Sequence, residues 1–265
     1  MRLVAVAFLT IAGIASASKR GLAWPWFNEQ SNFDPIRFTS EGKVSWMYNW
    51  ETWRPAKTPN VNFIGMQATR DSGASPIREL HNRWRTQGWT DVFSLNEPDQ
   101  NGISPQDAVG WYMQWINPMT IRKGLPAVTS STNRGMGLDW LQSFMDICKG
   151  HCYHDYINLH WYGSTFAQFQ AHINDAHKRF PQENIVISEF SLVAPASPQA
   201  QADFFRQAIS WLDGIGFVVM YFPFVATSPG MLSAHDGGAI SHVGTGGALF
   251  DNDGSVSIAG KSLLM

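Results

Sequence analysis

Eight short apolar runs recur along the chain and constrain its fold more than any other feature. Each is rich in β-branched or aromatic residues and has the length of a strand that is buried on both faces. The runs span residues 21–24, 44–50, 62–68, 91–97, 125–131, 156–162, 184–190 and 217–222. Strands of this kind need helices on the outside of their sheet, because a bare apolar face would stay in contact with water.

Helical patterns separate most of these runs. Apolar residues recur at helical spacing over residues 75–87, 138–147, 166–179, 199–212 and 257–264. Ser104 before Pro105 predicts a further helix, with Ser as its N-cap and Pro at its first position. Eight strands that alternate with helices in about 250 residues predict one α/β domain, a (β/α)8 or TIM barrel over residues 18–265.

The first two intervals between runs are too short for full βα units, which need roughly 30 residues. We therefore expect short or irregular crossovers after residues 24 and 50. The main alternative is an open doubly wound sheet. That fold favours a glycine-rich phosphate loop after the first strand, and this chain has "WPWFNEQ" there.

The charge pattern argues against a polyanionic partner. The formal net charge is −2 and no Lys/Arg-rich run occurs, so no binding of nucleic acid is expected. The chain is instead rich in aromatic side chains, with 12 Trp and 17 Phe. Trp presents a flat apolar face and one N–H group, which suits a ligand that has both apolar and polar faces.

The N-terminal segment has the pattern of a secretory signal peptide. Arg2 is followed by an apolar stretch over residues 3–14 and by small residues at 15–17. The stretch is short for a bilayer span, and no other segment is long and apolar enough to be one. We expect a signal peptide over residues 1–17, secretion to the extracellular space or cell wall, and no membrane anchor.

Two cysteines, Cys148 and Cys152, lie in the segment "CKGHC". A metal site would recruit His151 and His154 from the same segment, and no second cluster completes one. An isolated pair this close, in an oxidising compartment, predicts a disulfide bond that fixes local geometry. No metal and no other cofactor is expected.

Two carboxylates end apolar runs in a chain that is only 15% charged. Glu97 ends the fourth run and Glu189 lies at the end of the seventh, 189 − 97 = 92 residues apart, which corresponds to three βα units. Strands 4 and 7 of a closed barrel face each other across its mouth. Glycoside hydrolysis needs such a pair: one carboxyl group protonates the leaving oxygen and the other attacks or stabilises the anomeric carbon.

Asn96 and Glu97 are neighbours, so a regular strand would point their side chains to opposite faces. Both reach one site only if the strand ends or bulges there. Pro98 already prevents the next hydrogen bond of the ladder.

Other candidates stand where strands give way to loops. Pro25 and Pro223 mark two such points at the end of the barrel that carries active sites. The aromatic residues expected there are Trp24, Trp26, Phe222 and Phe224. Candidates for sugar contact by the same reasoning are Trp24, Trp50, Glu51, Gln67 and Trp161.

Some polar residues have a simpler interpretation. His160 sits deeper in its strand, where a hydrogen-bonded core histidine is the alternative to sugar contact. Asp34, Asp99 and residues 251–254 are expected in loops and turns, and the spacing of the last run differs from that of an EF-hand.

Three motifs together carry a family resemblance. The segments "LNEPDQ" around Glu97, "HWYG" from His160 and "ISEFS" around Glu189 are similar to those of glycoside hydrolase family 128, the β-1,3-glucanases of fungi and bacteria within clan A. The resemblance implies a retaining endo-β-1,3-glucanase with Glu97 as acid/base and Glu189 as nucleophile. It also implies that Asn96 hydrogen-bonds the sugar 2-hydroxyl and that Tyr162 orients the nucleophile.

The chain departs from the clan pattern at two places. Many members carry a Trp at the end of strand 8, where this chain has "YFPF", so Phe222 or Phe224 must supply that platform. The clan's strand-2 arginine is replaced by "YNWE". For a retaining enzyme we expect carboxyl groups about 5 Å apart, and a raised pKa at Glu97 caused in part by the negative Glu189.

Two other functions fit the same sequence. One is a β-1,4-glucanase or β-1,4-mannanase of the same clan. The other is a β-glucan-binding barrel without catalysis, which the fold alone does not exclude but the two retained carboxylates disfavour. In each case the partner is a β-glycan polysaccharide or oligosaccharide, and a monomer suffices.

Overall fold

The computed structural model describes residues 18–58 and 60–265. The expected signal peptide, residues 1–17, lies outside the described residues. No helix in the described part of the chain combines the length and the apolar character needed to cross a bilayer.

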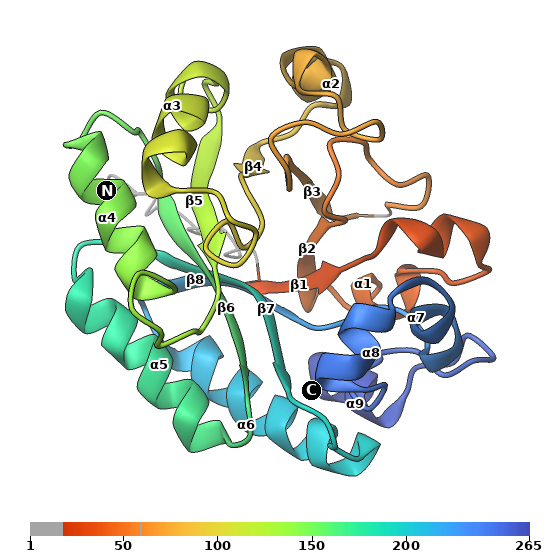
Figure 1. Cartoon of the computed structure of the whole chain (residues 1–265). Helices are drawn as coiled ribbons and strands as arrows, with labels where there is room; N and C mark the ends of the chain where they lie inside the picture. The colour runs from red at the N-terminus through yellow and green to blue at the C-terminus, as the bar shows by residue number, and fades with distance from the viewer. Residues whose placement is uncertain (1–17, 59) are drawn as a thin grey trace, which may run out of the picture.

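The strands form a closed parallel barrel, which confirms the predicted fold (Figure 1). In chain order they are β1 (Arg20–Ala23), β2 (Val44–Tyr48), β3 (Asn62–Met66), β4 (Asp91–Phe93), β5 (Arg122–Val128), β6 (Tyr156–Gly163), β7 (Ile185–Leu192) and β8 (Val218–Pro223). Neighbours in the sequence are neighbours in the barrel, and the pairing of Arg20 with Tyr221 closes it. The open doubly wound sheet is thereby excluded.

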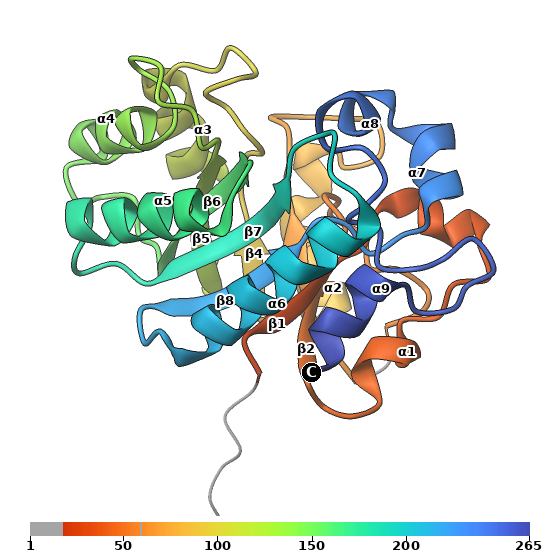
Figure 2. The same ribbon diagram turned by 90° about the horizontal axis from the view of Figure 1, so that it is seen from below.

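The helices predicted from apolar spacing, and the one predicted from Ser104 and Pro105, are all present and surround the barrel (Figures 1 and 2). They are η2 (Ile77–Glu79) with α2 (Leu80–Gln87), α3 (Pro105–Trp115), α4 (Leu138–Cys148), α5 (Phe166–Arg179), α6 (Pro198–Gly214), and α9 (Ile258–Lys261) with η3 (Ser262–Leu264). Ser104 caps α3 as predicted, because its side chain accepts a hydrogen bond from the backbone N–H of Asp107.

The first two crossovers are short, as expected. Between β1 and β2 the chain forms only η1 (Trp26–Gln30) and the single turn α1 (Ile36–Thr39). Among the described residues between β2 and β3 there is no helix. The outside of β1 and β2 is therefore covered by less helix than the rest of the barrel, where α3 to α6 pack.

Two helices after β8 were not predicted. They are α7 (Pro229–His235) and α8 (Gly237–Val243), which stand at the end of the barrel where the strands finish (Figure 2). Ser228 caps α7 and Pro229 takes its first position, the same signature that predicted α3. Each helix is only seven residues long, too short for a clear apolar period.

A compact cluster of large side chains fills the inside of the barrel. Phe222 is 0% exposed and lies edge-to-face against Tyr48 and Phe93, with ring centroids 5.1 and 5.9 Å away. A Cβ atom at Gly21 would approach the Phe222 ring within 2.0 Å, so β1 needs glycine at this point. Phe222 is therefore a core residue, and the expectation that it offers a sugar platform is wrong.

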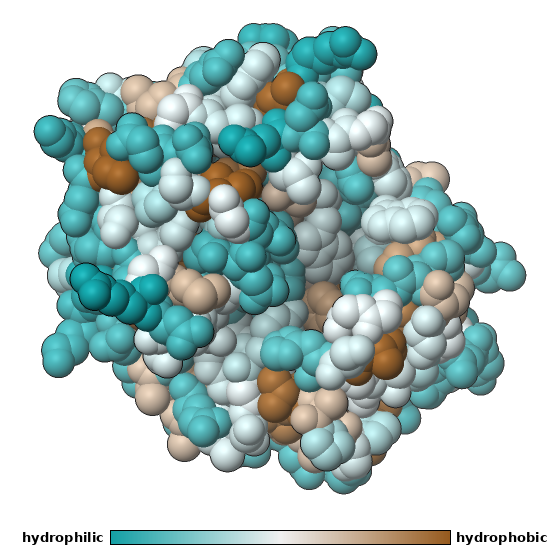
Figure 3. Space-filling view, in the orientation of Figure 1, coloured by the Kyte–Doolittle hydropathy of each residue, from teal (hydrophilic) through white to brown (hydrophobic). Residues whose placement is uncertain are grey.

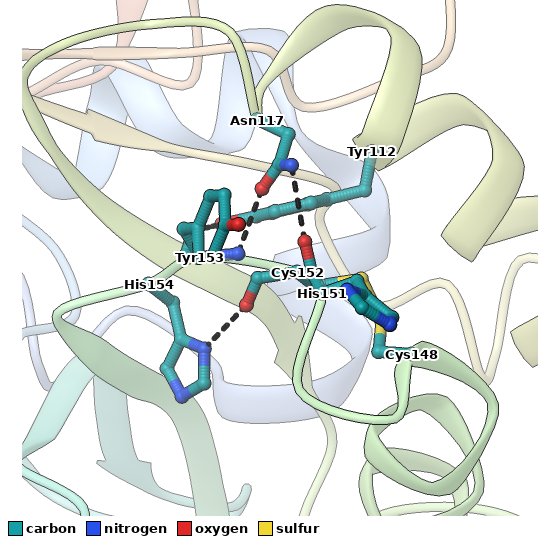
Figure 4. The surroundings of a disulfide bond; sticks show 7 residues. All are labelled: Tyr112, Asn117, Cys148, His151, Cys152, Tyr153 and His154. Atoms are coloured by element: carbon teal, nitrogen blue, oxygen red, sulfur yellow. Dashed lines mark hydrogen bonds between the residues drawn. A yellow bond between two sulfur atoms is a disulfide. The ribbon is translucent and has the colours of Figure 1, made fainter.

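The disulfide bond between Cys148 and Cys152 is present, as predicted (Figure 4). It joins the end of α4 to the loop before β6, with the two Cα atoms 5.5 Å apart. Asn117 braces the same loop, because it accepts a hydrogen bond from Tyr153 N and donates one to His151 O. Within residues 18–58 and 60–265, neither His151 nor His154 belongs to a group that could hold a metal ion, and His154 pairs with Cys152 O and with Glu183.

We expect Phe222→Ala to lower the free energy of unfolding by about 3–5 kcal/mol, because it leaves a cavity inside the barrel. Urea denaturation followed by Trp fluorescence measures the change. Phe222→Leu should cost less, since more of the volume is kept. A loss below about 1 kcal/mol for Phe222→Ala would contradict the interior position.

Candidate active site

The backbone turns sharply where β4 ends, and this turn presents Glu97. The strand stops at Phe93, and the chain rejoins the sheet through a single bridge between Asn96 and Ala127. Glu97 donates its backbone N–H to Ala127 O at 2.8 Å and has a positive φ of 45°. The strand thus ends before the Asn96–Glu97 pair, as the alternation argument required, and both residues line the same cavity.

A register shift in β7 presents Glu189. Leu159 of β6 pairs with Ile187, but the next residue, His160, pairs with Glu189. Ser188 is the extra residue of this irregularity. As a result Ser188 and Glu189 both contact His160, although they are neighbours in a strand.

Two donors fix the carboxylate of Glu189. Tyr162 donates its hydroxyl to Oε2 at 2.5 Å, and Trp50 donates its indole N–H to Oε1 at 2.7 Å. Each oxygen therefore has its own donor, which sets the rotation of the carboxylate. Trp50 itself has a positive φ of 61° at the end of β2.

His160 lies between the two glutamates. Its Nδ1 is 2.8 Å from Glu97 Oε1, and its Nε2 is 2.9 Å from Ser188 Oγ and 3.4 Å from Glu189 Oε1. One carboxylate oxygen from each glutamate and one ring nitrogen lie within 4.8 Å of one another. Within the described residues this is the one such set close enough to hold a metal ion, but both ring nitrogens already have oxygen partners.

The pKa of Glu97 is lowered, which corrects the expected direction. Burial acts to raise this pKa, but the hydrogen bond and the charge of His160 outweigh it, and His242 adds to the lowering. The prediction named the neighbouring Glu189 as one cause and did not include His160. His160 lies on β6, two residues before Tyr162, and its ring stands between the two carboxyl groups.

His160 and Glu189 shift in the other direction. Burial opposes a charge on His160, yet the carboxylates of Glu189 and Glu97 raise its pKa. The pKa of Glu189 is also raised, first by burial and further by the charge of Glu97, while His160, Tyr162 and Trp50 act against that rise. The shifts of His160 and Glu97 are therefore opposite in direction, and both favour a proton on the His160 ring over one on the Glu97 carboxyl group.

The carboxylates face a cavity of about 1020 Å³, which opens as a hollow near the middle of the face shown in Figure 3. Glu97 is 17% exposed at its side chain and Glu189 only 7%. Glu97 therefore stands nearer the opening, and Glu189 lies deeper. The lining residues come from two groups of loops, one on the Glu97 side and one on the Glu189 side.

Asp99 organises the wall on the Glu97 side. Its carboxylate accepts hydrogen bonds from Thr129 Oγ1 at 2.5 Å and from Gly137 N at 2.8 Å. These bonds hold the loop over residues 129–136, much of which lines the cavity. Asp99 lies in a loop, as expected, but it also shapes the cleft.

Aromatic and aliphatic side chains build the wall on the Glu189 side. Phe27 of η1, Phe224 after β8 and Leu232 of α7 pack in one cluster, and Trp50 contacts it. Phe224 lies edge-to-face against Trp50 and Tyr162, with ring centroids 6.0 and 5.8 Å away. Phe224, and not Phe222, thus lines the cavity at the end of β8.

The predicted contact residues divide into two groups. Asn96, Trp50, Glu51 and Tyr162 line the cavity together with the glutamates. Four others pack in the core and do not line it: Trp24, Gln67, Trp161 and Phe222, which are 1%, 0%, 3% and 0% exposed. His160 is also fully buried, so it contacts the glutamates and not the cavity surface.

Glu51 adds a third carboxyl group to the cavity. Its side chain accepts a hydrogen bond from Ser75 Oγ, and burial raises its pKa despite this bond and the charge of Arg83. Gln67 donates hydrogen bonds to the backbone carbonyl groups of Thr69 and Ser75, and so holds the loop that carries the partner of Glu51.

Several cavity residues were not predicted as site residues, chiefly because α7 and α8 were not predicted. They include Phe27, Leu232, Asp236 and His242. The Ser228-Pro229 cap was the available signal for α7, whereas Phe27 lies in η1.

A protein-family model described as glycosyl hydrolase catalytic core matches residues 21–262. A crystal structure of a family 128, subgroup IV, endo-β-1,3-glucanase from Lentinula edodes is 51% identical, with a TM-score of 0.89, and the match covers 92% of this chain and 98% of that one. The chain belongs to glycoside hydrolase family 128.

More distant matches agree on the fold. A family 128, subgroup I, endo-β-1,3-glucanase from Amycolatopsis mediterranei, in complex with laminaritriose, is 22% identical with a TM-score of 0.71 and covers 93% of this chain and 98% of that chain. The alkali-sensitive linkage protein 1 of Schizosaccharomyces pombe is 28% identical over 257 residues. That match spans 92% of this chain but only 44% of the yeast protein.

We expect His160→Phe to raise the pKa of Glu97 above its wild-type value. The substitution keeps a buried ring but removes the hydrogen bond and the charge that lower this pKa, whereas burial and Glu189 remain. A ¹³C NMR titration of the Glu97 carboxyl group measures the change. Ser188→Ala is the matched control, because it leaves the contact between His160 and Glu97 in place. An unchanged Glu97 titration in His160→Phe would show that His160 does not control it.

Proposed function

We propose that this family 128 glycoside hydrolase is a secreted, retaining endo-β-1,3-glucanase. The observation that carries the proposal is the convergence of Glu97 and Glu189 on one cavity, with an oxygen of each within 4.8 Å of the other. Retaining enzymes have carboxyl groups about 5–5.5 Å apart, whereas inverting enzymes leave room for a water molecule at roughly 6.5–9.5 Å. The short separation supports double displacement.

In this mechanism Glu189 attacks the anomeric carbon. The role of Glu189 as nucleophile is supported by Tyr162 and Trp50. Their hydrogen bonds hold both carboxylate oxygens and favour the ionised form that a nucleophile needs. Attack forms a covalent glycosyl-enzyme and releases the leaving sugar. Water then cleaves the intermediate at the same carbon, so the product keeps the β configuration.

Glu97 protonates the leaving oxygen and later activates water. The lowered pKa of Glu97 raises the question of where its proton comes from. His160 Nδ1 lies 2.8 Å away, so a proton on this nitrogen reaches Glu97 by moving across one hydrogen bond. The total charge of the three groups stays the same during this shift, and the site needs no proton from outside.

The nature of the substrate is supported by similarity. The Lentinula edodes relative, at 51% identity, is an endo-β-1,3-glucanase. Lining residues on both sides of the carboxylates suit a chain that extends past the cleaved bond in both directions. Asn96 Oδ1 is buried and has no partner among the described residues, which leaves it free to accept a hydrogen bond from a sugar hydroxyl.

The rivals make different predictions. A β-1,4-glucanase or mannanase would prefer β-1,4 chains in a panel of β-glucans and mannans. A binding barrel without catalysis would release no reducing ends from laminarin. Secretion rests on the signal-peptide pattern of residues 1–17.

We expect the first product formed from laminarin to carry the β configuration at its new reducing end, because double displacement inverts the anomeric carbon twice. Proton NMR within the first minutes, before mutarotation, measures this. An α-anomer as the first product would require an inverting mechanism and reject the proposed roles.

Azide should rescue the two glutamate variants differently. With an activated aryl β-glycoside, Glu97→Ala keeps its nucleophile, forms the intermediate and should release the β-glycosyl azide. Glu189→Ala leaves room for azide on the attacking side and should give the α-azide. Product NMR distinguishes the two, and the opposite pair of products would exchange the roles. Full activity of either variant on laminarin would remove that residue from the mechanism.

A further inference from the structure

Trp26 is the most exposed of the large aromatic side chains that line the cavity. It is 44% exposed, whereas Phe27 and Phe224 are 4% and 8% exposed. Trp50 and Tyr162 are partly buried and already bonded to Glu189. Trp26 therefore offers apolar surface to the cavity that the catalytic machinery described above does not use.

The Trp26 ring is held in place by its neighbours. It lies edge-to-face against Phe27 and His235, with ring centroids 5.7 and 5.8 Å away. These two rings are themselves stacked 4.9 Å apart, at an angle of 13°. Phe27 comes from η1, which follows β1, and His235 comes from the end of α7, which follows β8. The stacking of these two rings therefore joins the loop after the first strand to the loop after the last strand.

The position of Trp26 assigns it to one side of the cleaved bond. Phe27 belongs to the same cluster as Phe224, and Trp50, which contacts that cluster, donates to Glu189. Trp26 thus extends the wall on the nucleophile side and lies opposite the loop that Asp99 holds. The nucleophile attacks the anomeric carbon of the sugar that stays on the enzyme, so the glycon part of the substrate occupies this side.

We infer that Trp26 is a binding platform for a glucosyl unit of the glycon, beyond the sugar that reacts. The inference rests on the proposed function, because it assumes a β-glucan in the cleft. A fixed indole presents a broad apolar face to the C–H groups of a pyranose ring, while its N–H stays available for a hydroxyl group. Binding energy from such a remote unit lowers the barrier for long substrates only, since a short glycon does not reach the platform.

The test compares substrates of different length. We expect Trp26→Ala to lower kcat/KM for laminarihexaose by about tenfold, and to leave kcat/KM for an aryl β-glucoside within about twofold of the wild-type value. Trp26→Phe should retain most of the activity on laminarihexaose because it keeps an aromatic face. The product profile of Trp26→Ala should also shift, since fewer long glycons bind.

Tyr153→Ala is the matched control. Tyr153 is 63% exposed, next to the disulfide-bonded Cys152 in the loop that precedes β6, at the end of the barrel away from the cleft. This variant removes an exposed aromatic side chain and should change neither substrate. Thermal melting checks that each variant is folded.

The possible outcomes distinguish a failure of the inferred role of Trp26 from a failure of the proposed function. If the wild-type protein cleaves laminarihexaose and Trp26→Ala does so equally well, the platform is rejected and the proposed function stands. An equal loss on the aryl glucoside and on laminarihexaose also rejects the platform, because it indicates a general disturbance of the cleft. If the wild-type protein cleaves no β-1,3-glucan at all, the proposed function itself fails.

Discussion

Two carboxyl groups that share one small cavity repel each other when both are ionised, and the rest of this site is arranged around that repulsion. His160 lies between Glu97 and Glu189 within hydrogen-bond reach of the first and 3.4 Å from the second. Burial alone would keep the ring neutral, but the two carboxylates raise its pKa enough to reverse that effect. The two carboxylates thus favour a proton on the ring between them, and a proton there reduces the repulsion between two glutamates that lie close together. Such closeness is the geometry that double displacement requires.

Backbone irregularities bring these three side chains together. A regular strand sends neighbouring side chains to opposite faces, yet Ser188 and Glu189 both contact His160, and Asn96 and Glu97 both line the cavity. The register shift in β7 and the early end of β4 resolve both conflicts. The regular strands build the core of the barrel, whereas the irregular ends of β4 and β7 orient Glu97 and Glu189 toward the cavity.

The sequence predicted the barrel and the meeting of Glu97 and Glu189 at its mouth, because both depend on local pattern. Apolar runs of strand length are visible without any tertiary knowledge, and the spacing from Glu97 to Glu189 follows from the repeat. Depth of burial could not be predicted in this way. Trp24 and Trp26 are two residues apart, yet one is 1% and the other 44% exposed, because the short helix η1 begins at Trp26. The pKa of Glu97 likewise depends on a residue from another strand, which no local pattern reveals.

The wall on the Glu189 side joins η1, near the start of the barrel, to α7, after its last strand. These segments are separated by about 200 residues, and they meet only when β1 pairs with β8. Bringing together segments so far apart in the chain costs loop-closure entropy, which the packing of the closed barrel must offset. Glu97 follows β4 and Glu189 lies on β7, whereas the wall beside Glu189 needs segments from both ends of the chain. Any change that parts β1 from β8 therefore separates the two halves of this wall, although neither Glu97 nor Glu189 lies on those strands.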